Sequence, residues 1–115
     1  MDRNLDIVIL LDIYGELLAN SQRQALDMKY NADLSLAEIA EEMGGITRQS
    51  VFYSLKQGEQ RLSELEEKLG FAKRLRVLSG ELRQAKELVG GLREQYGDER
   101  LSRLSEILDE VQQGL

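Results

Sequence analysis

The stretch LAEIAEEMGGITRQSVFYSLKQG, residues 36–58, decides the fold of this chain. It predicts a short helix, a turn with two glycines, and a second helix that opens with small polar and basic residues. Ser35 and Glu38 have the spacing of a capping box, in which each side chain bonds the other residue's backbone amide. Thr47 is placed to cap the second helix. This order of elements is typical of a helix-turn-helix unit, a common DNA-binding motif.

Four positions in this stretch meet the packing demands of such a unit. Ala40 is small enough for the second helix to approach closely, and a glycine at 44 or 45 supplies the left-handed backbone that ends the first helix. Ile46 is expected to plug the core after the turn, and Val51 to anchor the second helix. Two features depart from the usual pattern: the double glycine lengthens the turn by one residue, and Ser54 stands where an apolar residue is frequent.

The composition favours an all-α protein of one small domain, or a domain with an appended helical arm. The chain has 115 residues, 42% hydrophobic and 31% charged, and no proline. Good helix formers dominate, and no residue type that breaks helices is present apart from glycine. There is no cysteine and no histidine, which removes disulfides, thiolate metal sites, and the commonest general base and metal ligand. We therefore expect neither an enzyme nor a bound cofactor.

The segments before the motif predict two more helices. Residues 5–18 form a helix that is apolar on most sides, which indicates that more than one side is covered. Residues 21–30 form a second helix, with Asn20 and Ser21 as its capping pair. The apolar run 7–11 is too short for a signal peptide or a membrane span, and Asp12 closes it. We expect no membrane insertion and a cytoplasmic location.

An apolar stripe continues from the motif into the second half of the chain. It carries residues spaced like a coiled-coil seam, namely Val51, Leu55, Gly58, Leu62, Leu65 and Leu69, and it resumes after Gly70 as far as Leu92. Glycines at 90–91 and 97 are expected to end helices, and Asp98 to cap the last one. We therefore expect a head over 1–70 and a helical dimerisation arm over 71–115. The stripe is either the core of one chain or a homodimer interface; we favour the interface because the stripe is longer than a small head can cover.

Charge divides the chain at the same place. Residues 1–70 hold 7 basic and 13 acidic side chains, whereas 71–115 hold 8 of each, and the whole chain has net charge −6. Within the acidic head, the segment 46–58 carries two cations and no acid. In the usual docking mode, the start of the second helix enters the major groove. The residues expected to contact nucleic acid are Thr47, Arg48, Gln49, Ser50, Tyr53 and Lys56.

The magnitude of such binding is expected to be small. Firm binders neutralise about six to ten phosphates, and this face offers about three cations when Arg61 is included. Binding of DNA or RNA should therefore be weak and sensitive to salt. The alternative interpretation is that these side chains are simply solvated, and that the acidic helical head is an adaptor that binds another protein instead of nucleic acid.

Four sequence blocks resemble a known family. NSQRQ (20–24), SLAEIAEE (35–42) and TRQSV (47–51) are similar to sigma-factor region 4 and, more narrowly, to the YlxM family of small bacterial helix-turn-helix proteins, as is LSELEEKL (62–69). The resemblance implies a sigma-region-4-like helix-turn-helix head with a long C-terminal helical extension. Genes of that family sit beside those of the signal recognition particle. The resemblance therefore implies a regulatory role in that targeting pathway, with components of the particle as partners.

Overall fold

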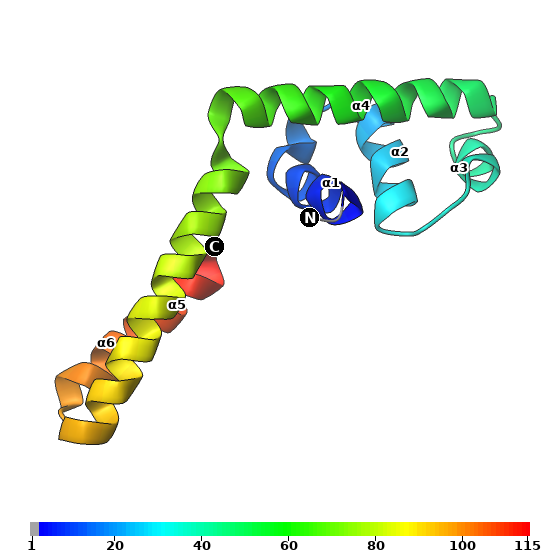
Figure 1. Ribbon diagram of the computed structural model, residues 1–115. Coiled ribbons are helices and arrows are strands. Elements are labelled where there is room, and N and C mark those ends of the chain that lie inside the picture. Colours follow the sequence, from blue (N-terminus) through cyan, green and yellow to red (C-terminus); the bar gives the residue numbers. More distant parts are fainter. Residues whose placement is uncertain (1–2) are drawn as a thin grey trace. The chain divides into compact units, whose positions relative to one another are not determined.

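The computed structural model describes residues 3–115, and they form helices and no strand (Figure 1). The all-α prediction is therefore confirmed for this part of the chain. Residues 1 and 2 lie outside the described residues. They belong to the N-terminal segment that is expected not to be a signal peptide. The elements are α1 (Arg3–Tyr14), the 3-10 helix η1 (Gly15–Leu17), α2 (Asn20–Tyr30), α3 (Leu36–Glu42), α4 (Arg48–Leu69), α5 (Phe71–Tyr96) and α6 (Glu99–Gly114).

The chain forms two compact units, Met1–Ala72 and Lys73–Leu115. We call the first unit the head; it contains α1 to α4 and the first two residues of α5. We call the second unit the hairpin, because the rest of α5 turns at Gly97 and returns as α6. Among the described helices, none is long and apolar enough to cross a membrane.

The core of the head forms where α4 lies across α1, α2 and α3 (Figure 1). One face of α4 supplies Val51, Leu55, Leu62 and Leu65, all of them buried. They pack with buried residues of the other three helices: Ile7, Leu11, Tyr14, Ala25, Leu26, Ile39 and Ala40. The stretch 51–65 of the apolar stripe is thus covered by other helices of its own chain. This part of the stripe is therefore not the dimer interface that the sequence predicts. Leu69, the last stripe residue of α4, is exposed.

The predicted helix caps of the motif are present. Ser35 Oγ accepts from the Glu38 amide at 3.2 Å, and Glu38 Oε1 accepts from the Ser35 amide at 3.1 Å. Thr47 Oγ1 accepts from the Ser50 amide at 3.0 Å. Asp98 likewise caps α6 by accepting from the Arg100 amide at 2.9 Å. Each cap satisfies a backbone donor that the first turn of a helix leaves free.

The expected cap of α2 is wrong. The helix begins one residue earlier than predicted, at Asn20, and Ala19 occupies the capping position without a side-chain hydrogen bond. Asn20 and Ser21 are exposed residues in the first turn. The Ala19 carbonyl still accepts from the Arg23 amide at 3.0 Å, so the first helical bond forms without side-chain capping.

The prediction that Ile46 plugs the core is also wrong, because its side chain is 36% exposed. Gly44 and Gly45 both adopt left-handed backbone, with φ of 89° and 79°. Two such residues in succession turn the chain away from the core before Ile46 is reached. Met43, on the other side of the turn, packs against the core instead.

The contact between α2 and α4 depends on Gly58. A Cβ atom built on Gly58 would lie 2.7 Å from Leu26 Cδ1 and 3.3 Å from Gln22 Cβ. A side chain at this position would force the buried Leu26 side chain to shift within a closely packed core. The glycine that was read as one position of an apolar stripe is therefore the point at which two helix backbones approach closely.

The glycines of the hairpin differ from expectation as well. Gly90 and Gly91 do not end a helix but lie inside α5, which runs without interruption from Phe71 to Tyr96. The helix boundaries fall at Gly70 and Gly97, whose φ values are 65° and 63°. A left-handed residue ends a helix, and only those two glycines adopt this conformation in the second half of the chain, all of which the structure describes.

A buried tyrosine holds the last residues of the head together. Tyr14 Oη donates to Glu66 Oε1 at 2.7 Å and accepts from the Phe71 amide at 3.1 Å. Glu66 Oε1 also accepts from the Ala72 amide at 3.0 Å, and the Tyr14 ring stacks on Phe71 at 6.3 Å between centroids. Burial, and then the hydrogen bond to Glu66, raise the pKa of Tyr14 above its usual value. Tyr14 and Glu66 therefore each accept a hydrogen bond from one amide at the start of α5 that would otherwise lack a helical partner.

Candidate nucleic-acid interface and an acidic groove

The first two turns of α4 present one face to the core and the other to solvent. Val51 and Leu55 are buried, four residues apart, as the helical period requires. All six residues expected to contact nucleic acid are exposed. Gln49, Tyr53 and Lys56 follow each other at spacings of four and three, so they share the side of α4 opposite the core. Arg48 and Ser50 lie on the two flanks of this side, and Thr47 precedes the helix. We call the six exposed residues at the start of α4 the α4 face: Thr47, Arg48, Gln49, Ser50, Tyr53 and Lys56.

The α4 face is weakly basic. It carries Arg48 and Lys56, and the next acid along the helix is Glu59. The Tyr30 hydroxyl donates to Glu59 Oε1, so that carboxylate is already engaged inside the head. Among the residues that the structure describes, no carboxylate pairs with Arg48 or Lys56. Both cations are therefore open to a phosphate or a base edge.

The hydroxyl of Thr47 has a structural task as well. Its oxygen accepts from the Ser50 amide, which fixes the rotamer at the start of α4. The same hydroxyl keeps its own hydrogen, so it can donate to an acceptor outside the helix. An anion near this end of α4 would also meet the positive end of the helix dipole.

One exposed aromatic residue on this part of α4, Phe52, is not among the six predicted contact residues. Phe52 is 56% exposed and lies beside Tyr53, which is 65% exposed. Phe52 stands four residues after Arg48, so the two side chains are neighbours on the helix surface. The signal was available, because a residue next to the buried Val51 is turned by about 100° away from it.

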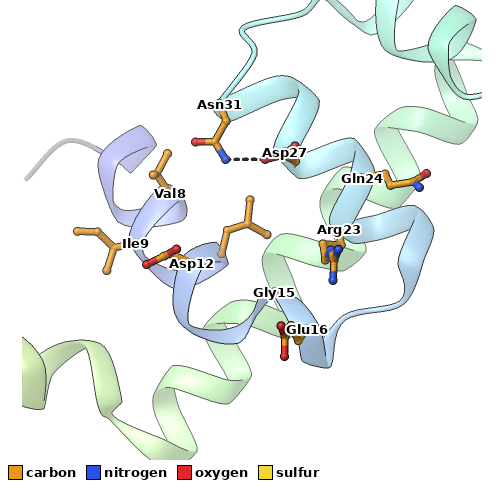
Figure 2. A pocket seen from close by; sticks show the side chains of 10 residues that line it. Val8, Ile9, Asp12, Gly15, Glu16, Arg23, Gln24, Asp27 and Asn31 are labelled. Atoms are coloured by element: carbon orange, nitrogen blue, oxygen red, sulfur yellow. Dashed lines mark hydrogen bonds between the residues drawn. The ribbon is translucent and has the colours of Figure 1, made fainter. Parts of the chain in front are cut away.

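A second feature of the head is an open groove between α1 and α2 with a volume of about 510 Å³ (Figure 2). Val8 and Ile9 give it an apolar wall along α1, and both are half-buried. Its charged residues are three acids and one base, namely Asp12, Glu16, Asp27 and Arg23. Asn31 donates to Asp27 Oδ1 at 2.7 Å, drawn as the dashed line in Figure 2. With three acids and one base, the groove is an electronegative surface. In the described part of the chain, no group of three or more His, Cys, Asp or Glu side chains is placed to hold a metal ion.

Comparison with known proteins gives a consistent result along most of the chain. The model of the UPF0122 family, described as "Putative helix-turn-helix protein, YlxM / p13 like", matches residues 1–97. The UPF0122 protein of Thermoanaerobacter sp. strain X514 is 38% identical over 113 residues, which cover 97% of this chain and 96% of that protein. The UPF0122 protein of Halalkalibacterium halodurans is 38% identical over 112 residues, covering 97% and 99%. That of Clostridium kluyveri strain ATCC 8527 is 36% identical over 111 residues, covering 96% and 93%.

Proposed function

The chain belongs to the UPF0122 family of YlxM-like helix-turn-helix proteins, and from that premise we propose that it is a regulatory protein that binds DNA or RNA through the α4 face. The observation that supports the proposal is that all six predicted contact residues are exposed at the start of a helix that is anchored by the buried Val51 and Leu55. Arg48 can contact guanine in bidentate geometry, and Gln49 can do so with adenine. Thr47 and Ser50 suit phosphate oxygens.

The proposed pathway is targeting by the signal recognition particle. It rests on the resemblance to the YlxM family and not on any contact in the structure. A regulator in that pathway would work in the cytoplasm and would meet the RNA and the protein components of the particle. The resemblance of the sequence blocks in the head to sigma-factor region 4 supports the same mode of docking for α4.

The binding should be weak because few cations take part. The basic side chains that the α4 face can use are Arg48, Lys56 and Arg61. Arg61 Nη1 also lies 3.7 Å from Glu64 Oε2, which offsets its charge. Each phosphate contact makes the slope of log affinity against log salt concentration steeper by about one unit. We therefore expect affinity at about 50 mM salt that is largely lost at about 200 mM.

The test is a titration of the purified protein against mixed duplex DNA and against the targeting-particle RNA at those two salt concentrations. The variant Arg48→Ala should weaken binding by about 1–3 kcal/mol if Arg48 reads a base, and it should leave the melting temperature unchanged because the side chain is exposed. Arg83→Ala, an exposed arginine in α5, is the matched control and should bind like the wild type. Absence of binding to both nucleic acids at the lower salt would show that the α4 face is not a nucleic-acid interface.

The acidic groove between α1 and α2 favours a second candidate function, that of an adaptor that binds another protein. Its apolar wall and its excess of acids suit a helix with apolar residues on one side and basic residues beside them. Nucleic acid would be repelled from this groove, so the two functions use different surfaces.

A double variant separates the two candidates. Asp12→Asn with Glu16→Gln removes two charges from the groove and leaves the α4 face intact. If the groove is an adaptor site, the variant should bind a synthetic Lys/Leu amphipathic helix at least tenfold more weakly than the wild type. Equal binding of that peptide by variant and wild type would contradict the adaptor function, whatever the outcome with nucleic acid.

A further inference from the structure

The hairpin leaves a row of large apolar side chains exposed on both of its helices. Leu88 is the most exposed, at 71%. The others lie further along the same helices and are all exposed: Leu78 and Leu92 in α5, and Leu104, Ile107 and Val111 in α6. Single exposed apolar residues need no explanation, but a contiguous row of them on one unit does.

These side chains lie on one face of the hairpin. At 100° per residue, Leu88 and Leu92 sit to one side of the buried Val89. Leu104, Ile107 and Val111 sit to the corresponding side of Leu108 in α6. In an antiparallel helix pair, corresponding sides point the same way. An open cavity lined by both Leu92 and Leu104 agrees with this arrangement.

The opposite face of the hairpin is polar. Lys86 Nζ lies 2.6 Å from Asp109 Oδ1 and donates to Gln112 Oε1 at 2.8 Å. This link joins α5 to α6 on the side away from the apolar row. The hairpin is thus amphipathic as a whole, with one apolar face and one face closed by polar contacts.

The hairpin buries too little to be stable without help. Its residues, 73–115, are all described by the structure, and Val89 is the one apolar side chain among them that is buried. A unit of about 40 residues generally needs a disulfide, a metal or association with another chain to fold stably, and cysteine is absent from the sequence. The apolar face is the surface through which association would complete the core.

We propose that this face packs against the same face of a second copy of the chain, which makes an antiparallel four-helix bundle. A two-fold interface uses the same patch on both copies, and bundles of this kind bury apolar residues from facing helices. Charge supports a second copy as the occupant, because residues 73–115 hold 8 basic and 8 acidic side chains and so do not repel themselves. The head, with 7 basic and 13 acidic residues, would repel a second head.

The size of the face is sufficient for a specific dimer. The length of α6 is about 24 Å at a rise of about 1.5 Å per residue, and two adjacent helices are about 20 Å wide. The footprint is then roughly 500 Å² on each copy and about 1,000 Å² in total, the lower bound for a specific interface. This inference does not depend on nucleic-acid binding, because it rests on the hairpin alone.

Sedimentation equilibrium of the full chain, from about 1 to 100 μM, tests the proposal. The wild type should show twice the monomer mass of 13.1 kDa at the upper concentrations. Leu88→Glu places a charge in the centre of the face and should raise the dimer dissociation constant at least tenfold. Leu17→Glu, at an exposed leucine of the head, is the matched control and should dimerise like the wild type. Circular dichroism of each variant verifies that the helices remain folded.

Two results would overturn the proposal. A wild type that remains at 13.1 kDa up to the highest concentration would show that no second copy covers the face. Dimerisation lost in Leu17→Glu but kept in Leu88→Glu would place the interface on the head instead. Because Ile107 lies on the same face in α6, Ile107→Glu is a second variant that must give the same result as Leu88→Glu.

Discussion

Tyr14 shows how much one side chain can contribute at a helix boundary. It is almost fully buried, at 1% exposure, and its hydroxyl joins the carboxylate of Glu66 to the amide of Phe71. The two residues lie more than fifty positions from Tyr14 in sequence. No local pattern could reveal such a contact, because neither partner is within reach of Tyr14 until the head has folded.

Tyr14→Phe should therefore lower the free energy of unfolding by about 1–3 kcal/mol, since it leaves a partly buried amide without an acceptor. Thermal and denaturant unfolding measure the loss. Tyr53→Phe, at an exposed tyrosine, should leave stability unchanged. A loss of equal size in both variants would show that the hydrogen bonds of Tyr14 are not its cause.

The same residue predicts a dependence on alkaline pH. Burial raises the pKa of Tyr14 in the folded state, so ionisation favours the unfolded chain. Its contribution is complete below the unfolded pKa of about 10 and is lost as the pH rises through the higher folded pKa. The difference in stability between the wild type and Tyr14→Phe should thus narrow above about pH 10. A difference that stays constant from pH 7 to 11 would contradict this mechanism.

In the candidate site, the exposure of some residues could be predicted from the sequence and that of others could not. The exposure of Gln49, Tyr53 and Lys56 could be predicted because burial at Val51 and Leu55 sets the face of the helix. The exposure of Ile46 could not, because it depends on the conformation of two consecutive glycines in the turn. The α4 face was thus predictable, whereas the path of the chain into it was not.

The motif helix α3, at the scale of an element, depends strongly on its capping box. Only seven residues long, it would be marginal without its capping and packing. Hydrogen bonds from the Ser35 backbone and side chain hold the pKa of the Glu38 carboxyl below its usual value. The carboxylate form therefore contributes stability above the unfolded pKa, and this contribution is lost as the pH falls through the folded pKa.

Ser35→Ala should destabilise the head by about 0.5–2 kcal/mol, the usual cost of losing a cap. The more specific measurement is a carbon-detected NMR titration of Glu38, whose pKa should rise only part of the way toward its ordinary value, because the backbone amide of residue 35 remains in the variant. Ser50→Ala is the control, because its side chain caps no helix and only its backbone amide is used. An unchanged Glu38 titration in Ser35→Ala would show that the Ser35 side chain does not contribute to the lowered pKa.

Two glycines within helices distinguish the effect of helix propensity on stability from the effect of packing. Gly58→Ala gains helix propensity, but its methyl group would meet Leu26 and Gln22 in a buried contact. The net effect should be a loss of about 1–3 kcal/mol, as for other overpacked cores. Gly90→Ala, whose Cβ would meet no atom within 4 Å, should instead stabilise its helix by about 0.5–1 kcal/mol. Unfolding curves of both variants decide the matter, and a stabilising Gly58→Ala would disprove the close approach of α2 and α4.

Element boundaries were predictable where their signals are local. The caps at Ser35, Thr47 and Asp98 each need only a side chain and an amide two or three residues away. The continuity of α5 through Gly90 was not predictable in this way. Glycine ends a helix only when it adopts the left-handed conformation, and the residue type alone does not show which glycines do so.

For the whole molecule, the proposed dimer and the proposed nucleic-acid binding together predict a salt dependence. One α4 face with about three cations gives a slope of about −2.7 in log affinity against log salt, and two faces bound together give about −5.4. The slope should therefore be near the larger value for the wild type and near the smaller for Leu88→Glu. Binding isotherms at four salt concentrations measure both. Equal slopes would mean that the two heads of a dimer do not bind the same nucleic acid.

The adjacent glycines Gly90 and Gly91, in the last third of α5, affect where local unfolding of the hairpin begins. Each glycine costs a helix about 1 kcal/mol relative to alanine, and neither Gly90 nor Gly91 has a neighbour that a side chain would touch. Amide hydrogen exchange should therefore be faster from Gly90 to the end of α5 than in the residues that precede Val89. The hairpin would then unfold from its turn inward as a unit separate from the head, whose helices are secured by the core around Leu26 and Leu62.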